Sequence, residues 1–303
     1  MIDSLKPAAA SVKGTLHGED AMFSGISTDT RTLQAGALFF ALLGPSFDGS
    51  EFVGVARMRG AAGAVVPRRL DEKIPQIEVP DTRRALGRFA AAWRNEQDLT
   101  VIGITGSNGK TTVKELVRAC VSQRATTLAT EGNLNNDIGL PLMLARIKAS
   151  HQFGVFEMGA SHVGEIAYLT SLARPAIVVI TNAAAAHLEG FGSLNRVAEG
   201  KGEILRNPAR PRVAVLNADD HYFDYWRSAV TDIETISFGL SASADVYAED
   251  IESGAERSLF LLRLPDTDIT IDLPLAGSHN VRNACAAAAV ALALDIDPAM
   301  IKR

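Results

Sequence analysis

A run of β-branched residues leads directly into a glycine-rich loop at residues 100–114, which read TVIGITGSNGKTTVK. The run that ends at Ile104 has the composition of a buried strand, and the residues from Val113 to Val121 favour a helix. Strand, glycine loop, Lys-Thr and helix follow one another in this order in P-loops, where backbone N–H groups surround phosphate oxygens. This order predicts an α/β fold with a phosphate site at the end of a strand.

The residues of this loop also predict how a nucleoside triphosphate binds. Lys110 is placed to reach the β- and γ-phosphates, and the Thr111 hydroxyl to coordinate Mg²⁺. The strict G-x-x-x-x-G-K-[ST] pattern requires glycine at position 104, where this chain has Ile104, so the tighter T-G-x-x-G-K-T form begins at Gly106 and indicates a subset of ATP users. A plain βα turn with a surface lysine is the alternative. The predicted nucleotide contacts are Thr105, Gly106, Ser107, Asn108, Gly109, Lys110, Thr111 and Thr112.

The composition is that of an ordinary globular protein. The chain has 303 residues, of which 47% are hydrophobic and 21% charged, enough for roughly two domains. Its net charge of −5 argues against nucleic acid or an anionic membrane as a partner. The N-terminus lacks the pattern of a signal peptide, and no apolar run is long enough to span a membrane. Cys120 and Cys285 are expected to be buried apolar residues, so we expect a cytoplasmic enzyme.

The first 80 residues read as a small α/β domain. Strands are expected at 37–43, 63–66 and 76–79, with a helix at 52–59. Asp81 is expected to cap a helix that ends near Asn95 and leads into the P-loop strand. The boundary lies near Val79 or near Asp98, and we take the domains as 1–80 and 81–303.

The rest of the chain predicts a P-loop domain with a mainly parallel sheet, because strands and helices alternate up to about residue 240. Ligands of such sheets bind beyond the carboxyl ends of the strands. Residues 245–273 instead read as short strands joined by turns, which predicts an antiparallel extension of the sheet. An alanine-rich helix follows up to about Leu294. The expected parallel strands are 100–104, 125–129, 153–158, 176–181, 212–217 and 233–238.

Three residues near strand ends are candidates for metal chemistry. Glu157 closes an apolar strand, where a carboxylate is costly unless paired, and Mg²⁺ ligation is favoured over a structural ion pair. His187 lies in a glycine-flanked loop beyond the next strand, and a metal ligand and a capping or core histidine fit it equally well. Lys201 lies on a predicted helix over residues 193–205, and its type and position alone favour a solvated lysine.

Several polar loop residues are candidates for substrate contacts. Asn135 and Asn136 lie in a turn-rich segment at a strand end, where they suit phosphate or sugar oxygens, although loop composition explains them equally well. Ser27, Asp29 and Arg31 belong to the segment STDTR, and Phe47-Asp48-Gly49 follows an apolar strand. These are ordinary turns or, together, a site for a nucleotide base and diphosphate.

The chain resembles the Mur ligases of bacterial peptidoglycan synthesis over nearly its whole length. The resemblance rests on SNGKTT, GNLNNDIG, FEMGA, NAAAAHLEGFGS, GKGEIL, LNADD and GSHNVRNACAA. The segments STDTRTLQAGALFFALLGPSFDG and AAAAHLEGFGS are closest to those members that add D-alanyl-D-alanine to UDP-N-acetylmuramoyl-tripeptide.

This resemblance implies roles for the candidate residues. The N-terminal domain is expected to bind the UDP part of the substrate through Ser27, Asp29, Arg31 and Asp48, with Asn135 and Asn136 at the muramyl-phosphate end. The central domain is expected to bind MgATP, with Asn280 and Asn283 near the adenine. Thr111, Glu157, His187 and Lys201 match metal-associated positions. Lys110, Lys201 and His187 are expected to be catalytic, and Lys201 matches a lysine that members carry as a carbamate.

The implied reaction is ATP-dependent amide formation through an acyl phosphate, by a monomer with ATP and Mg²⁺ as cofactors. Family members have a third, C-terminal domain of dinucleotide-fold type that this sequence does not reach, so we expect the 303 residues alone to bind the UDP-substrate, to bind nucleotide weakly and to show little or no ligation. Two alternatives stay open. One is a related ATP-dependent ligase with another acceptor, such as a sister Mur enzyme or a folylpolyglutamate synthetase-like protein. The other is a non-catalytic P-loop module that binds nucleotide without a UDP-sugar.

Overall fold

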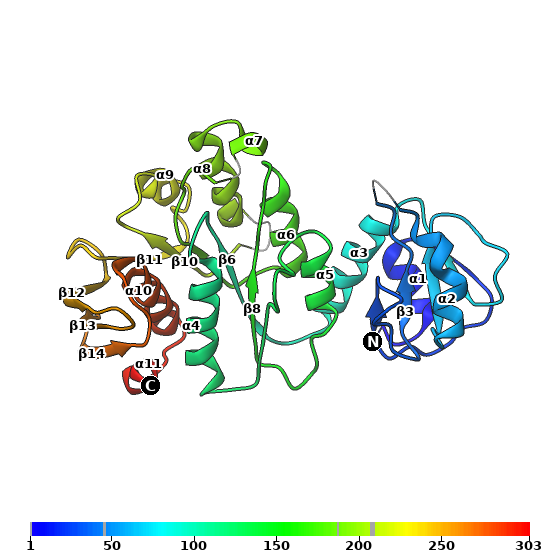
Figure 1. Ribbon diagram of the computed structural model, residues 1–303, viewed down its shortest axis with the longest axis horizontal. Helices are drawn as coiled ribbons and strands as arrows, with labels where there is room; N and C mark the ends of the chain where they lie inside the picture. The colour runs from blue at the N-terminus through cyan, green and yellow to red at the C-terminus, as the bar shows by residue number, and fades with distance from the viewer. Residues whose placement is uncertain (1, 45–46, 187, 207–209) are drawn as a thin grey trace. The chain divides into compact units, whose positions relative to one another are not determined.

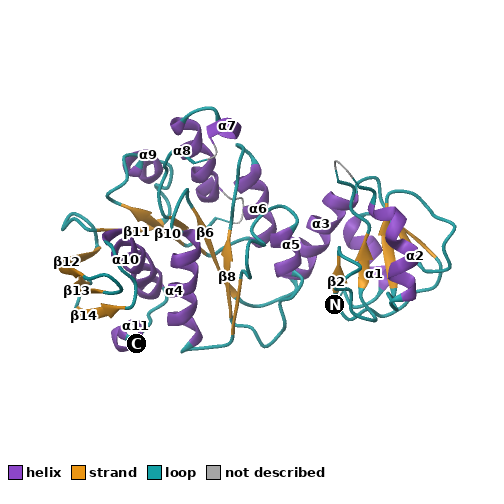
Figure 2. Cartoon of the chain, viewed as in Figure 1, coloured by secondary structure: helices purple, strands orange, loops and turns teal. Residues whose placement is uncertain are grey.

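The computed structural model describes residues 2–44, 47–186, 188–206 and 210–303. The chain divides into two compact units (Figure 1). The first comprises residues 1–98 and 137–148, and the second comprises residues 99–136 and 149–303. Each unit has its own sheet, as Figure 2 shows.

In the first unit, the described strands form a five-stranded sheet in the order β1-β5-β4-β3-β2. Strand β1 is antiparallel to β5, and the other neighbours are parallel. The strands are β1 (Thr15–His17), β2 (Ile26–Ser27), β3 (Leu38–Phe40), β4 (Gly63–Val66) and β5 (Gln76–Glu78). The helices are α1 (Leu5–Val12), the 3-10 helix η1 (Gly49–Phe52), α2 (Val53–Met58), α3 (Thr82–Asn95) and α5 (Gly139–Leu144).

Both faces of this sheet are covered, which explains the unbroken apolar run in β3. Side chains alternate between faces along a strand. Leu38 and Phe40 share one hydrophobic cluster with residues of α1 and α3, whereas Phe39 lies in a second cluster with residues of α2. Every residue of β3 is therefore buried on one side or the other.

Helix α3 belongs to the first unit. Asp81 caps it by accepting hydrogen bonds from the backbone N–H groups of Arg83 and Arg84, as the sequence predicts. Its apolar face, with Leu86 and Phe89, shares a cluster with α1 and β3. The chain therefore divides after Asp98, later than the expected boundary after residue 80.

In the second unit, the described strands form a nine-stranded sheet in the order β14-β13-β12-β11-β10-β9-β6-β8-β7. The pairs from β7 to β12 are parallel, and β12, β13 and β14 are antiparallel. This is the predicted mainly parallel sheet with its antiparallel extension. The strands are β6 (Thr100–Thr105), β7 (Thr127–Ala129), β8 (Phe153–Glu157), β9 (Ile177–Ile180), β10 (Val213–Asn217), β11 (Glu234–Gly239), β12 (Val246–Ser253), β13 (Ser258–Arg263) and β14 (Asp268–Leu273).

Two helices of this unit lie side by side against the sheet (Figure 1). They are α4 (Lys110–Ser122) and α10 (Ser278–Ala293), and their buried faces join one hydrophobic cluster with the strands. The alanines of α10 let this helix pack closely against α4 and the strands, because an alanine side chain is a single methyl group. Cys120 and Cys285 are both buried in this cluster, as predicted. The other helices are α6 (Glu165–Ala173), α7 (Leu188–Phe191), α8 (Leu194–Gly202), the 3-10 helix η2 (Glu203–Arg206), α9 (Phe223–Ser228) and α11 (Pro298–Lys302).

None of the helices in the described ranges combines the length and the apolar character needed to cross a bilayer.

Candidate active site

The predicted P-loop lies between β6 and α4. Gly106 has φ +146°, and a Cβ there would stand 1.9 Å from the Thr181 hydroxyl oxygen. Gly109, the N-cap of α4, has φ +81°, and a Cβ there would stand 2.5 Å from the Asn283 side-chain oxygen. Only glycine fits these two positions without strain. The loop therefore brings backbone N–H groups and a helix N-terminus together, which is the arrangement that binds phosphate.

Residues after the neighbouring strand β9 hold the loop in place. The Asn108 N–H donates to Asn182 Oδ1 at 3.0 Å, and the Thr181 hydroxyl donates to the Asn108 carbonyl at 2.6 Å. The Ser107 N–H donates to the Asn182 carbonyl at 3.0 Å. Neither Thr181 nor Asn182 was predicted to belong to the site. Their position at the carboxyl end of a parallel strand is the signal that could have found them.

Lys110 begins α4 and folds back over the loop. Its ammonium donates to the carbonyls of Gly106 at 2.8 Å and Ser107 at 3.0 Å. Burial lowers the pKa of Lys110, and the nearby Glu157 carboxylate opposes that shift. A cation is thus held where phosphates would meet the loop. Thr105, by contrast, is fully buried, and its hydroxyl donates to the Met158 carbonyl, so its side chain points into the protein.

Glu157 lies beside the loop with both carboxylate oxygens engaged. The Thr111 hydroxyl donates to Glu157 Oε2 at 2.9 Å, and Asn135 Nδ2 donates to Oε1 at 2.9 Å. The register of the sheet explains the position, because Glu157 on β8 is paired with Ile104 on β6. The Glu157 residue is 3% exposed.

This oxygen-rich group fits Mg²⁺, which prefers hard oxygen ligands and is usually held by one or two protein groups together with substrate phosphates. The hydroxyl and carboxylate of the predicted pair, Thr111 and Glu157, meet that requirement. No cluster of three or more His, Cys, Asp or Glu residues occurs in the described ranges. His187, the other predicted ligand, lies outside the described residues.

Lys201 is buried, at 2% exposure, so the solvated lysine favoured by its residue type and position alone is wrong. It lies at the end of α8, where its ammonium is 3.5 Å from the Ala160 carbonyl oxygen and 5.4 Å from the centre of the Phe191 ring. Burial, with a further contribution from the charge of Lys110, lowers the pKa of Lys201 from its ordinary 10.5 to about 8. Periodicity could have indicated this burial, since Val197 and Ala198 on the same helix are apolar and also buried.

The first turns of α10 carry the two asparagines predicted near the adenine. Asn280 Nδ2 donates to the Ala276 carbonyl at 2.8 Å. Asn283 is mostly buried, and its side-chain oxygen lies against Gly109 of the P-loop. The structure thus brings Asn283 to the predicted nucleotide loop. Asn135 likewise reaches the site through Glu157, and Asn136 follows it in the chain.

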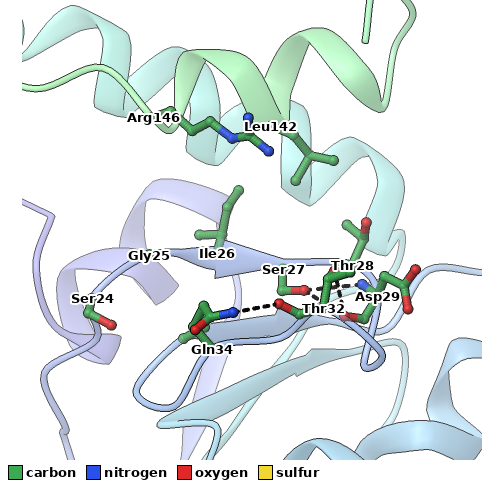
Figure 3. A pocket seen from close by; sticks show the side chains of 11 residues that line it. Ser24, Gly25, Ile26, Ser27, Thr28, Asp29, Thr32, Gln34, Leu142 and Arg146 are labelled. Atoms are coloured by element: carbon green, nitrogen blue, oxygen red, sulfur yellow. Dashed lines mark hydrogen bonds between the residues drawn. The ribbon is translucent and has the colours of Figure 1, made fainter. Parts of the chain in front are cut away.

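A cavity of about 390 Å³ in the first unit contains part of the predicted substrate site (Figure 3). Arg146 and Leu142 line one side, facing Ile26 and Ser27 on the other. Arg146 was missed because nothing in its local sequence sets it apart. The full lining is Ser24, Gly25, Ile26, Ser27, Thr28, Asp29, Thr32, Gln34, Ala37, Leu142 and Arg146.

Two of the four predicted UDP-binding residues line this cavity and two do not. Ser27 and Asp29 belong to its wall. Arg31 is absent from the lining and pairs with Asp29, with 2.6 Å between its Nη2 and the Asp29 Oδ2. This pairing lowers the pKa of Asp29. Asp48 instead caps η1, where its side chain accepts a hydrogen bond from the Ser50 N–H at 2.8 Å.

Comparison with known families gives two matches. Residues 104–291 match the description "Mur ligase middle domain", and residues 22–94 match "Mur ligase family, catalytic domain". The first alone spans more than half of the chain.

Individual proteins give the same result. The chain is 42% identical over 284 residues to the UDP-N-acetylmuramoyl-tripeptide–D-alanyl-D-alanine ligase of Escherichia coli (strain K12), covering 93% of this chain and 63% of that protein. It is similar to MurF from Acinetobacter baumannii, with a TM-score of 0.91 and 37% identity over 97% of this chain and 66% of the other. MurF ligase from Thermotoga maritima, solved in complex with ADP, has a TM-score of 0.80 at 27% identity, covering 92% of this chain and 65% of that one. The chain therefore spans a little under two thirds of the length of the proteins it matches.

Proposed function

The chain belongs to the Mur ligase family, and we propose that it serves the ATP-dependent joining of D-alanyl-D-alanine to UDP-N-acetylmuramoyl-tripeptide in peptidoglycan precursor synthesis. The observation that carries the proposal is the group formed by the glycine loop, Lys110, Thr111 and Glu157. The name of the relative in Escherichia coli supports the choice of substrates. We propose that it acts as a monomer in the cytoplasm.

The two units have separate roles in this proposal. The second unit binds ATP, with its phosphates at the loop from Gly106 to Thr112 and its adenine near Asn280 and Asn283. The first unit binds the UDP part of the other substrate, in the cavity lined by Ser27, Asp29 and Arg146. Hydroxyl groups and a guanidinium are suitable partners for the oxygens of a ribose and a diphosphate, which supports this assignment.

The reaction has two steps. A carboxylate oxygen of the tripeptide attacks the γ-phosphorus of ATP, the bond to the β-γ bridging oxygen breaks, and an acyl phosphate and ADP result. The amine of D-alanyl-D-alanine then attacks the acyl carbon, loses a proton and expels phosphate. Two anions must approach each other in the first step, so stabilisation of charge at the transferring group is the main requirement. Lys110 supplies positive charge there, and no side chain has to act as a nucleophile.

Mg²⁺ would be held by the Thr111 hydroxyl and the Glu157 carboxylate, with His187 and Lys201 as the further candidates. When bound, it neutralises phosphate charge. Asn135 orients Glu157 by donating to its second oxygen.

Lys201 is proposed to carry a carbamate. The neutral amine attacks the carbon of CO₂ and loses a proton, which leaves an N-carboxylate anion of the kind that suits Mg²⁺. Its burial and its pKa of about 8 support the proposal, because they leave a fraction of the amine neutral near physiological pH.

A pair of variants tests the proposal by isothermal titration. Lys110→Ala should weaken MgATP binding by about 10- to 100-fold, because a charged partner of the phosphates is lost, and should leave binding of UDP-N-acetylmuramoyl-tripeptide unchanged. Arg146→Met should weaken binding of the UDP-substrate by about tenfold and leave binding of MgATP unchanged. Nucleotide binding without any affinity for the UDP-substrate in the unaltered chain would instead favour a non-catalytic P-loop module.

A further inference from the structure

Lys114 is a buried lysine that neither the predicted nucleotide site nor the reaction uses. It lies on α4, one helical turn after Lys110, and is 2% exposed. Its ammonium donates to the Thr130 carbonyl at 2.8 Å and is 2.8 Å from Glu115 Oε1. A buried ammonium is costly unless it is paired. Glu115 is half-exposed, so the Thr130 carbonyl is the buried partner of this cation.

Thr130 connects Lys114 to Glu157. It follows β7, and its N–H donates to the Val155 carbonyl at 3.0 Å. Its hydroxyl accepts a hydrogen bond from the Glu157 N–H at 3.0 Å. Thr130 therefore bonds to both residues. Its carbonyl accepts from Lys114, and its hydroxyl accepts from the backbone of Glu157, the candidate metal ligand.

The loop that starts at Thr130 contacts Glu157 a second time through Asn135. Asn135 Nδ2 donates to Glu157 Oε1 at 2.9 Å, and the Asn135 carbonyl accepts from the Gly159 N–H at 2.9 Å. The loop at residues 130–135 thus bonds to the Glu157 backbone N–H and to one of its carboxylate oxygens. The Thr111 hydroxyl of α4 bonds to the other carboxylate oxygen.

We infer that Lys114 is a positioning residue, which ties α4 to the loop at residues 130–135 so that Glu157 faces Thr111. Thr111 and Lys114 are three residues apart on one helix, which places them on neighbouring positions of the same face. Thr111 donates a hydrogen bond to the Glu157 carboxylate, and Lys114 donates one to the loop that orients this carboxylate. This inference rests on the proposed function, since the carboxylate matters most when it holds Mg²⁺.

The test compares two variants of α4. Lys114→Met keeps the length of the side chain and removes the donor. Arg118→Met is the matched control, because Arg118 also pairs with Glu115, at 2.7 Å, but is exposed. Amide hydrogen exchange on the chain without metal or nucleotide reports on the loop directly. We expect faster exchange at residues 130–135 in Lys114→Met and no change in Arg118→Met.

Binding supplies the second readout. Loss of a residue that orients a metal ligand typically weakens metal binding by about 10- to 100-fold, so we expect Lys114→Met to weaken ADP binding with Mn²⁺ or Mg²⁺ by about tenfold or more, while binding in EDTA stays the same. Thr130→Val, which removes the hydroxyl but keeps the carbonyl, should act in the same direction and keeps the test decisive if Lys114→Met does not fold.

The outcomes distinguish the positioning role of Lys114 from the proposed function. Unchanged metal-dependent binding in Lys114→Met and Thr130→Val would overturn the positioning role, as would an equal loss with and without metal or an equal effect of Arg118→Met. Absence of metal-dependent nucleotide binding in the unaltered chain would overturn the proposed function, and the inference with it.

Discussion

Replacement of Lys201 by methionine should stabilise the second unit near neutral pH. The side chain is buried, and its pKa falls from 10.5 to about 8 mainly through loss of hydration. That difference corresponds to about 3 kcal/mol of folding free energy spent on keeping the amine charged. Methionine fills a similar volume without a charge. It loses the contact of the ammonium with the Phe191 ring, worth about 1 kcal/mol, so the expected net gain is about 2 kcal/mol.

The sign of the pH dependence follows from the direction of the shift. Between pH 8 and 10.5 the unfolded chain binds more protons at Lys201 than the folded chain, so the stability of the wild-type protein rises with pH in that window. Below pH 8 the full free-energy cost of burying the charged Lys201 applies, and above pH 10.5 this cost vanishes. The advantage of Lys201→Met should therefore be largest at pH 7 and should disappear by about pH 10.5.

Urea unfolding in CO₂-free buffer at pH 7 and pH 10 measures this effect. Trp226 fluorescence is a suitable probe because this residue is buried in the same unit, and its indole N–H donates to the Ala198 carbonyl of α8 at 3.0 Å. All variants carry Trp93→Phe, which removes the tryptophan of the first unit. Lys302→Met, at an exposed lysine, is the control and should show no pH-dependent difference. A Lys201→Met protein that is less stable than wild type at pH 7, or equally favoured at both pH values, would refute the reasoning.

Two further substitutions test the loop and the core. Gly106→Ala places a methyl group 1.9 Å from the Thr181 hydroxyl oxygen at φ +146°, so nucleotide binding measured by titration should fall by about tenfold or more, whereas Gly254→Ala, whose nearest neighbour is 3.6 Å away, should bind normally. Phe89→Ala removes a buried ring whose centre lies 5.8 Å from that of Phe40, and it should destabilise the first unit by about 3–5 kcal/mol in urea unfolding while nucleotide affinity persists. Loss of nucleotide binding in Phe89→Ala, or normal binding in Gly106→Ala, would contradict these expectations.

The fold was largely predictable because local pattern and chain order agree along most of this sequence. The P-loop strand and helix, the capped helix after Asp81 and the antiparallel strands after residue 245 all lie where periodicity and turn residues place them. Helix α1 (Leu5–Val12) was not predicted. Its apolar residues are buried against the first unit's core, and tertiary packing stabilises a helix this short.

The positions of the candidate site residues were predictable where these residues follow strand ends, and not where they come from distant segments of the chain. Glu157 and Thr111 meet as expected because β8 and β6 are neighbours with carboxyl ends at one edge. Arg146 joins the cavity of Ser27 from a segment more than a hundred residues away in the chain, which no local pattern signals. Residue type alone predicted Lys201 to be solvated, since lysine in general prefers solvent, whereas packing of α8 buries it.

The central claim is that the loop after β6 binds the phosphates of ATP beside a metal-binding carboxylate. A crystal structure of the chain with Mg²⁺ and a non-hydrolysable ATP analogue tests it most directly. We expect the phosphates against the backbone N–H groups at the N-terminus of α4, the Lys110 ammonium turned from the Gly106 carbonyl to the phosphates, and the metal between Thr111 and Glu157. A nucleotide bound elsewhere, with Lys110 still bonded to the loop carbonyls, would contradict the claim.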